Sequence, residues 1–271
     1  MAQITSFIRW AGGKSWLVPF VKELIDGLEY NNYHEPFMGG ASVFFSIDAP
    51  GRSFLSDLNK ELVYTFCAVR DNPLRLNNYL REFSPDEESY YAIRGTNPIG
   101  KYQRAARFIY LNTYSYNGLY RENKRGEYNV PYGHNESATI NYDRIMAASE
   151  KLRNADILCR DFKSAEENIH EGDLVFLDPP YTVSKKSNEM FNKYNSKLFS
   201  LEDQERLGEM IDFINDRGAF YILTNAAHDT IFEIFHDRGR LIQRERNSLI
   251  GGREAFRGKV KEYIFTNIPE R

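Results

Sequence analysis

The sequence predicts an α/β fold in which a sheet is interrupted by a mainly helical insert. Short apolar runs typical of buried strands alternate with helical patterns over residues 15–57, and again after about residue 155. Between these regions, residues 60–115 carry helical patterns only. A length of 271 residues suits one large domain, or one core with an inserted lobe.

The first part of the chain has a strand–helix–strand pattern. Gly39 and Gly40 form the turn after its first strand, and Asp57 ends its second. The expected elements are a helix over 15–28, a strand over Tyr33–Phe37, a helix over Ala41–Ile47 and a strand over Ser53–Ser56.

The middle of the chain is punctuated by Asn72-Pro73, Ser84-Pro85 and Asn97-Pro98, which break its helical patterns. Residues 116–133 are rich in Asn, Gly and Tyr and predict a loop or hairpin. The expected elements thereafter are strands over Ile157–Cys159, Leu174–Leu177 and Ala219–Thr224, a helix over Leu201–Asn215, and an antiparallel strand pair over 240–246 and 260–267.

The composition is that of a soluble globular protein, with 42% hydrophobic and 27% charged residues. No run approaches the ~20 apolar residues of a membrane helix, and the first residues lack a secretory signal. Cys67 and Cys159 make neither a disulfide framework nor a metal spacing, so a reducing cytoplasm is expected. The net charge of -3 argues weakly against a polyanionic partner, but a local basic patch is enough to bind phosphates.

The motif that points to chemistry is Asp178-Pro179-Pro180-Tyr181, which follows the apolar run Leu174–Leu177. An acid at the carboxyl end of a buried strand lies where open α/β sheets bind ligands. Because proline has no N–H, the two prolines stiffen the turn and leave the Pro179 carbonyl free to accept a hydrogen bond.

Such a turn suits an exocyclic amino group of a base, which is a poor nucleophile because its lone pair is delocalised into the ring. The Asp178 carboxylate and the Pro179 carbonyl can accept its two N–H groups and so localise that lone pair. Tyr181 can stack on the base, which contributes roughly 1–3 kcal/mol. A base within a duplex must be flipped out to reach such a pocket.

Two further segments indicate a ligand site. Glu35-Pro36-Phe37-Met38-Gly39-Gly40 follows the first strand, and its glycines allow close approach to a ligand. Asp57 stands 17 residues after Gly40, the usual separation for an acid that holds ribose hydroxyls. Gly12-Gly13-Lys14 is no phosphate-binding loop of the nucleotide-hydrolysing kind, because Ile8 stands where the first glycine of that pattern belongs.

Together these segments resemble the Dam-type family of DNA adenine methyltransferases. The shared motifs are, in order, Trp10-Ala11-Gly12-Gly13-Lys14, Glu35-Pro36-Phe37-x-Gly-Gly, Asp57-Leu58-Asn59, Asp161-Phe162 and Asp178-Pro179-Pro180-Tyr181. The resemblance implies a Rossmann-like, S-adenosylmethionine-dependent methyltransferase sheet over 1–61 and 155–271. It also implies an inserted target-recognition domain over 62–154. Ala41 is a departure, since many relatives have a third glycine there.

The resemblance also assigns roles around the methyl donor and the target base. Asp57 would hold the ribose, Asp161 and Phe162 the cofactor adenine, and the turn from Asp178 to Tyr181 the target base. Asp178 would also contact the cofactor, and the remaining residues of the cofactor pocket would be Trp10, Gly12, Lys14, Glu35, Pro36, Phe37 and Gly39.

Residues 116–133 resemble the recognition hairpin of family members that read GATC. Arginine can grip guanine through O6 and N7, and apolar groups can contact the thymine methyl. The resemblance suggests Arg121 for a guanine, and Arg9, which is similar to a basic position of the family, for the first guanine. It suggests Leu119 and Pro131 for thymine and Tyr116 for a wedge in the base stack. The predicted DNA-binding residues are Arg9, Tyr116, Asn117, Leu119, Arg121, Asn123 and Pro131.

The expected reaction is direct in-line transfer of a methyl group to adenine N6 in duplex DNA, without a metal and without a covalent enzyme intermediate. N4-cytosine methylation stays an alternative, although such enzymes more often have Ser before the two prolines, and so does an inactive DNA-binding module. C5-cytosine chemistry is excluded because neither cysteine follows a proline.

A monomer in the cytoplasm of a prokaryotic or phage-infected cell is expected. Residues 185–197 are expected to form a flap that orders on DNA.

Overall fold

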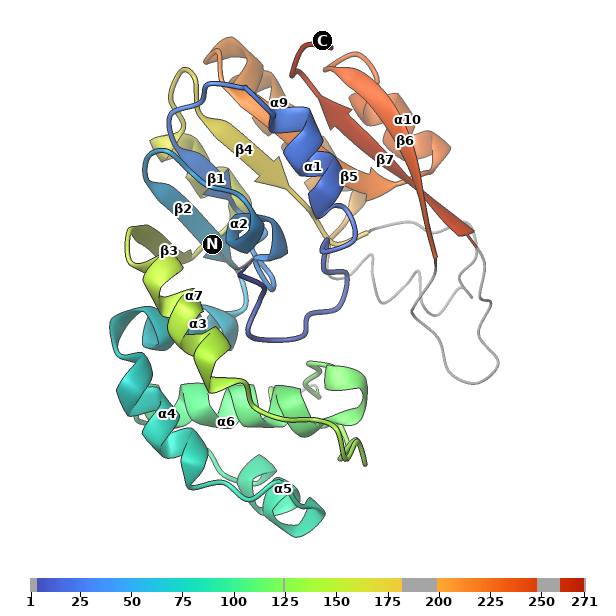
Figure 1. Ribbon diagram of the computed structural model, residues 1–271. Coiled ribbons are helices and arrows are strands. Elements are labelled where there is room, and N and C mark those ends of the chain that lie inside the picture. The colour runs from blue at the N-terminus through green and yellow to red at the C-terminus, as the bar shows by residue number, and fades with distance from the viewer. Residues whose placement is uncertain (1–3, 124, 182–198, 248–258, 271) are drawn as a thin grey trace. The chain divides into compact units, whose positions relative to one another are not determined.

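A single sheet organises the chain in the computed structural model, which describes residues 4–123, 125–181, 199–247 and 259–270 (Figure 1). Its seven strands follow the order β3-β2-β1-β4-β5-β7-β6. The strands are β1 (Tyr33–Glu35), β2 (Ser53–Asp57), β3 (Ala155–Cys159), β4 (Leu174–Leu177), β5 (Phe220–Ala226), β6 (Arg240–Asn247) and β7 (Lys259–Thr266).

Strand directions confirm the predicted α/β fold. β1 pairs with β4, and β4 with β5, in parallel, whereas β7 runs antiparallel to both β5 and β6. The closing antiparallel pair predicted over 240–246 and 260–267 is therefore confirmed. β1 is shorter than the predicted strand Tyr33–Phe37, and it ends where Pro36 has no N–H to offer a neighbouring strand.

The order of the strands reverses between β1 and β4. From β1 the chain proceeds outward to β2 and β3, and from β4 it proceeds to β5 on the other side. Open α/β sheets bind ligands at such a point, outside the carboxyl ends of the strands. The turn after β1 and the turn after β4 therefore bound the expected ligand site.

Side-chain caps explain where several helices begin. Asn72 accepts a hydrogen bond from the Arg75 N–H at 2.9 Å, and Pro73 takes the first helical position, which separates α3 from α4. Ser200 and Asp203 form a capping box. The helices are α1 (Val18–Ile25), α2 (Ser42–Ser46), α3 (Lys60–Asp71), α4 (Pro73–Arg81), α5 (Glu87–Arg94), α6 (Lys101–Tyr114), η1 (Tyr116–Gly118), α7 (Tyr142–Leu152), η2 (Phe162–Asn168), α9 (Leu201–Asp216) and α10 (Asp229–Phe235).

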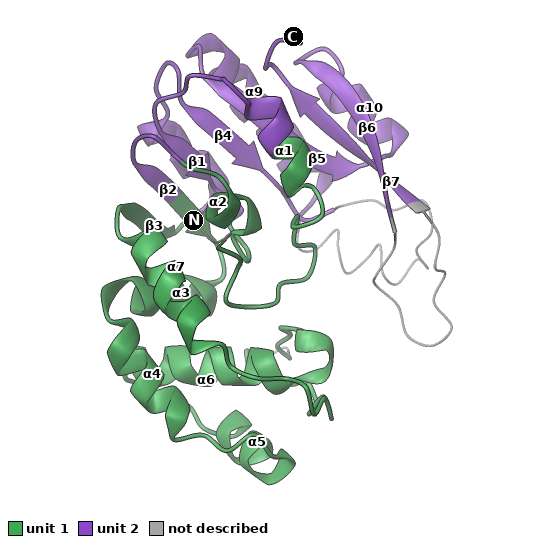
Figure 2. Ribbon diagram, viewed as in Figure 1, with its two compact units in different colours: residues 1–21, 38–48, 55–160 green, residues 22–37, 49–54, 161–271 purple. Residues whose placement is uncertain are grey.

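The chain folds into two compact units (Figure 2). Unit 1 comprises residues 1–21, 38–48 and 55–160, and unit 2 comprises residues 22–37, 49–54 and 161–271. Helices α3 to α6 of unit 1 lie within residues 60–115, where the sequence predicts helical patterns, and α7 is a further helix after that range. Across the described ranges, none of the helices has both the length and the apolar composition that crossing a bilayer requires.

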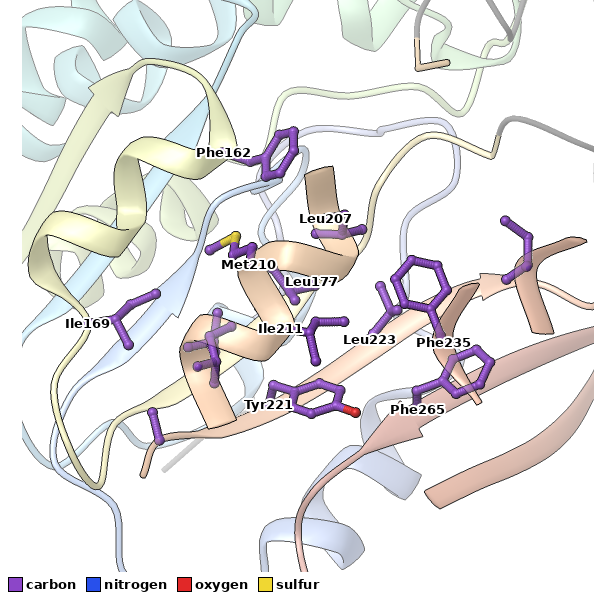
Figure 3. Packing of buried hydrophobic residues seen from close by; sticks show 14 of the residues in the cluster. Phe162, Ile169, Leu177, Leu207, Met210, Ile211, Tyr221, Leu223, Phe235 and Phe265 are labelled. Atoms are coloured by element: carbon purple, nitrogen blue, oxygen red, sulfur yellow. The ribbon is translucent and has the colours of Figure 1, made fainter. Parts of the chain in front are cut away.

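The core of unit 2 lies between α9 and the sheet. Figure 3 shows Leu207, Met210 and Ile211 of α9 directed toward the strands. These residues recur at helical spacing, and all three are fully buried. Burying a side chain of this size stabilises the fold by ≈ 1.5–3 kcal/mol. Leu177, the last residue of β4, belongs to the same cluster, so this packing fixes the strand end from which Asp178 emerges.

Candidate active site

Asp178 leaves the sheet at the carboxyl end of β4, as predicted. Its carboxylate is partly exposed, and Oδ1 accepts a hydrogen bond from the Thr224 hydroxyl at 2.7 Å. Thr224 lies on β5 and is fully buried. Because Leu177 pairs with Leu223 across the two strands, the register brings Thr224 beside Asp178. One oxygen of the acid is thus fixed by the neighbouring strand.

Tyr181 follows the two prolines, and its hydroxyl is buried beside the carboxylate of Glu262 on β7. Glu262 also pairs with Arg246 of β6. Burial raises the pKa of Tyr181 well above its usual value, and the nearby charges of Glu262 and Asp178 raise that pKa further. The phenol therefore keeps its proton, and Tyr181 offers a neutral ring rather than a base.

The turn after β1 places aromatic and acidic groups at the same edge of the sheet as Asp178, because β1 and β4 are parallel neighbours. Glu35 is buried and accepts a hydrogen bond from the Tyr33 hydroxyl at 2.7 Å. Pro36 is buried, and Phe37 stacks on Phe162 with ring centroids 5.1 Å apart. Of the predicted cofactor residues in this turn, Phe37 therefore contacts Phe162, and Glu35 and Pro36 are buried beside it in the chain.

Asp161 caps the short helix η2, where its carboxylate accepts a hydrogen bond from the Lys163 N–H at 3.0 Å. Arg206 of α9 pairs with the same carboxylate oxygen at 2.7 Å. The Arg206 guanidinium also lies 4.9 Å from the centroid of the Phe162 ring. The predicted pair Asp161 and Phe162 is thus held by a cation that the sequence interpretation missed.

A second group of predicted residues lies in unit 1, around Gly39. Its N–H donates to Asp57 Oδ2 at 3.0 Å, and its φ of +45° is in the left-handed region. A Cβ at Gly39 would lie 2.7 Å from Cδ1 of Trp10, so only glycine fits. Burial raises the pKa of Asp57, although the backbone N–H groups of Asn59 and Gly39 counteract this rise.

Each carboxylate oxygen of Asp57 accepts one backbone N–H, because Oδ1 accepts that of Asn59 at 2.8 Å. A carboxylate oxygen has capacity for a further donor, so the acid suits a ligand with hydroxyl groups. This acceptor, with the glycine cradle beside Trp10, fits the ribose of a nucleoside cofactor.

The loop from Trp10 to Lys14 folds back on itself in unit 1. Lys14 is buried, with 5% of its surface exposed, and its ammonium donates to the Gly12 carbonyl at 3.1 Å. The Gly13 N–H donates to the Trp10 carbonyl at 3.2 Å.

Ala41, where many relatives have a third glycine, has a φ of +51°, in the left-handed region. A residue with a Cβ costs roughly 1–2 kcal/mol in this conformation. The replacement of glycine by alanine is therefore felt as backbone strain and not as a matter of side-chain size.

The region predicted as a loop or hairpin closes through paired backbone groups. Tyr116 N–H donates to the Pro131 carbonyl at 2.9 Å, and Ser115 bridges Tyr132. Arg121 donates to the Asn129 side chain at 2.7 Å. Asn123 is used within the turn, where its Oδ1 accepts from the Arg125 N–H at 2.8 Å. The predicted DNA-binding residues are all exposed, namely Arg9, Tyr116, Asn117, Leu119, Arg121, Asn123 and Pro131.

Each unit thus assembles part of the predicted site. Unit 2 gathers Pro36, Phe37 and the turn after β4 with Asp161 and Phe162, and unit 1 gathers Trp10, Gly39 and Asp57. The expected flap over residues 185–197 lies outside the residues that the structure describes. Within those residues, no three His, Cys, Asp or Glu side chains gather as metal ligands would.

Thr224 and Arg206 are the supporting residues that the sequence interpretation missed. Thr224 ends the predicted strand Ala219–Thr224, so a polar residue at the carboxyl end of an apolar strand was the available signal. Arg206 gave no such signal in the sequence, because an arginine in a helix is usually exposed to solvent.

The family model for D12 class N6 adenine-specific DNA methyltransferases matches residues 10–249. Type II methyltransferase M1.LlaDCHI of Lactococcus lactis subsp. cremoris is 34% identical over 274 residues, which cover 96% of this chain and 94% of the relative. Type II methyltransferase M.MjaIII of Methanocaldococcus jannaschii is 34% identical over 253 residues, which cover 85% of this chain and 87% of the relative. DNA adenine methylase of Escherichia coli is 30% identical over 275 residues, which cover 97% of this chain and 95% of the relative.

These relatives give no support to an N4-cytosine enzyme or to an inactive binding module. Their names agree with the resemblance found in the sequence motifs, and the chain aligns with them over nearly its whole length. The chain belongs to the D12 class of N6 adenine-specific DNA methyltransferases.

Proposed function

We propose that the protein transfers the methyl group of S-adenosylmethionine to N6 of adenine in duplex GATC sites. The observation that supports this most directly is the Asp178 carboxylate, held by Thr224 at the switch point of the sheet. Residues 1–61 and 155–271 form the catalytic domain in this proposal, and 62–154 form the target-recognition domain. The enzyme acts as a monomer in the cytoplasm of a prokaryotic or phage-infected cell.

The cofactor residues divide according to the groups that they bind. Asp57 accepts the ribose hydroxyls, and Gly39 lets the ligand approach the backbone beside Trp10. Asp161 and Phe162 hold the cofactor adenine, since one is a hydrogen-bond acceptor and the other an aromatic ring already stacked on Phe37. When bound, S-adenosylmethionine supplies a methyl group on a positively charged sulfur, which is an activated leaving group. The other pocket residues in the proposal are Gly12, Lys14, Glu35 and Pro36.

The target base is activated by the turn after β4. Asp178 and the Pro179 carbonyl accept the two hydrogens of the adenine amino group, which returns the lone pair to N6. Pro180 keeps the turn rigid, and the neutral ring of Tyr181 stacks on the flipped base. Asp178 stabilises the positive charge that develops on N6 as the carbon–nitrogen bond forms and the sulfur–carbon bond of the donor breaks, and one N6 proton then passes to solvent. The protein contributes positioning and electrostatics, without a covalent intermediate.

Recognition of the site rests on exposed residues of unit 1. Arg9 reads the first guanine, which precedes the target adenine, and Arg121 reads another guanine, each through O6 and N7. Leu119 and Pro131 contact the thymine methyl. Tyr116, which is 49% exposed, fills the stack beside the flipped base. Asn117 and Asn123 shape the hairpin that presents these groups, in keeping with the turn contacts of the Asn123 side chain.

The test uses S-adenosylmethionine labelled in its methyl group, with one duplex that contains GATC and one in which the site is scrambled. Label is expected on the GATC duplex alone, and digestion with nucleases that respond oppositely to GATC methylation locates it. Equal label on both duplexes would reject the GATC assignment.

The role of Asp178 is tested with Asp178→Ala. Turnover is expected to fall about 100-fold or more while duplex binding is kept, because the acid acts on the amino group and not on the phosphates. Asp212→Ala is the matched control, since Asp212 is an exposed acid of unit 2 that pairs with Arg238 at 2.9 Å. Near-normal turnover of Asp178→Ala would show that another group activates the base.

A further inference from the structure

Asn112 is a buried amide near the end of α6, with 2% of its surface exposed. Its Oδ1 accepts the N–H of Arg9 at 2.9 Å, and its Nδ2 donates to the Arg9 carbonyl at 2.8 Å. The same Nδ2 donates to the Gly118 carbonyl at 3.0 Å. One side chain thus holds both backbone groups of Arg9 and also the turn η1, all within unit 1.

Helix packing or capping does not account for this arrangement. The Ser115 N–H already caps α6 by donating to Leu111, and the three side-chain bonds of Asn112 all leave the helix. A buried amide costs free energy unless it is hydrogen-bonded, so an apolar residue would serve packing equally well. The amide is therefore matched to the two backbone segments that it joins.

The two segments also touch each other. Gly118 has a φ of +64°, and a Cβ there would lie 2.9 Å from Cβ of Arg9. The Arg9 side chain consequently lies against the bare backbone of Gly118, between Tyr116 and Leu119 in the chain. Asn112 holds Arg9 from the backbone side, and Gly118 limits where its exposed guanidinium can go.

We propose that Asn112 is a positioning residue that sets the guanidinium of Arg9 against the recognition turn and thereby determines the preference for guanine at that position. This inference rests on the proposed function, in which Arg9 reads the guanine next to the target adenine. The guanidinium must meet O6 and N7 together, so loss of its backbone anchor costs discrimination at this base rather than general affinity.

The experiment measures kcat and KM on duplexes in which one strand already carries N6-methyladenine, so that only one adenine accepts. The guanine preceding that adenine is either unchanged or replaced by 7-deazaguanine, which lacks the N7 acceptor. For the wild type, kcat/KM is expected to fall about tenfold on the substituted duplex. Asn112→Ala is expected to lose this difference, by losing rate on the guanine duplex but little on the 7-deazaguanine duplex.

Thr113→Ala is the matched control, because the neighbouring Thr113 hydroxyl donates only to Ile109 within α6, at 2.8 Å. It is expected to keep the wild-type ratio. Gly118→Ala displaces Arg9 from the other side and is expected to reproduce the loss seen in Asn112→Ala. The ratio of the two duplexes is independent of the folded fraction, since unfolding lowers both rates equally.

A structural role alone would lower both rates of Asn112→Ala by one factor and keep the ratio, which would overturn the inference. An unchanged ratio with unchanged rates would overturn it too. A wild type that methylates GATC but ignores the guanine substitution would refute the role given to Arg9, and a wild type with no GATC preference would refute the proposed function itself.

Discussion

Gly39→Ala tests the cradle that the structure builds around the predicted ribose site. Gly39 has a φ of +45°, where any residue with a Cβ is strained. The added carbon would lie 2.7 Å from Cδ1 and 2.9 Å from Nε1 of Trp10. The Trp10 ring has little freedom to retreat, because it stacks on Tyr120 at 5.7 Å and on Phe108 at 6.4 Å.

Two costs combine in this variant. The left-handed backbone costs roughly 1–2 kcal/mol for a residue with a Cβ. Forcing the Trp10 ring to move adds the cost of overpacking, typically 1–3 kcal/mol. The free energy of unfolding is therefore expected to fall by about 2–5 kcal/mol, and displacement of Trp10 should weaken S-adenosylmethionine binding about tenfold or more.

Gly126→Ala is the matched control for Gly39→Ala. Gly126 has a φ of +76°, and a Cβ there meets no atom within 4 Å, so only the backbone cost applies. Urea unfolding followed by circular dichroism measures both variants, and calorimetric titration measures cofactor binding. Equal losses of unfolding free energy in the two variants, with wild-type cofactor affinity in Gly39→Ala, would refute the proposed contact between the cradle and Trp10.

The remaining predictions concern unit 2. Asp173 is fully buried and accepts hydrogen bonds from both the backbone and side chain of Asn32, from His170 N–H and from His34. Asp173→Ala should therefore lower the free energy of unfolding, measured in urea, by about 3–5 kcal/mol. Burial by itself would raise the pKa of Asp173, but the hydrogen bonds from His34, His170 and Asn32 lower it overall. The stabilisation by the Asp173 carboxylate is thus complete above the unfolded pKa of ≈ 3.9 and is lost as the pH falls through the lower folded pKa. Between pH 2 and pH 6, the free energy of unfolding in urea should therefore decline more steeply with acid in the wild type than in Asp173→Asn. Parallel curves for the two proteins would contradict this. Thr224→Val removes the hydroxyl that fixes Asp178, so kcat should fall about tenfold with cofactor affinity unchanged, and an unaltered kcat would mean that Asp178 needs no support from β5.

Most of the elements could be predicted from the sequence because strand and helix patterns depend on the period of the backbone itself. The strand Leu174–Leu177 and the helix beginning at Leu201 are found where the apolar patterns indicate them. The candidate residues on the turns could also be predicted, because Asp178 and Gly39 belong to contiguous motifs that follow strands. β1 ends two residues before its predicted end, at Pro36, whose missing N–H is itself visible in the sequence.

By itself, then, the sequence determined the order of the elements, the motifs on their connecting turns and the family to which they belong. Only the tertiary structure decided which distant side chains support those motifs. Thr224 is 46 residues from Asp178, Arg206 is 45 residues from Asp161, and Asn112 is 103 residues from Arg9. No local pattern encodes such pairs, because they depend on strand register and helix packing, which bring together residues that the chain keeps far apart.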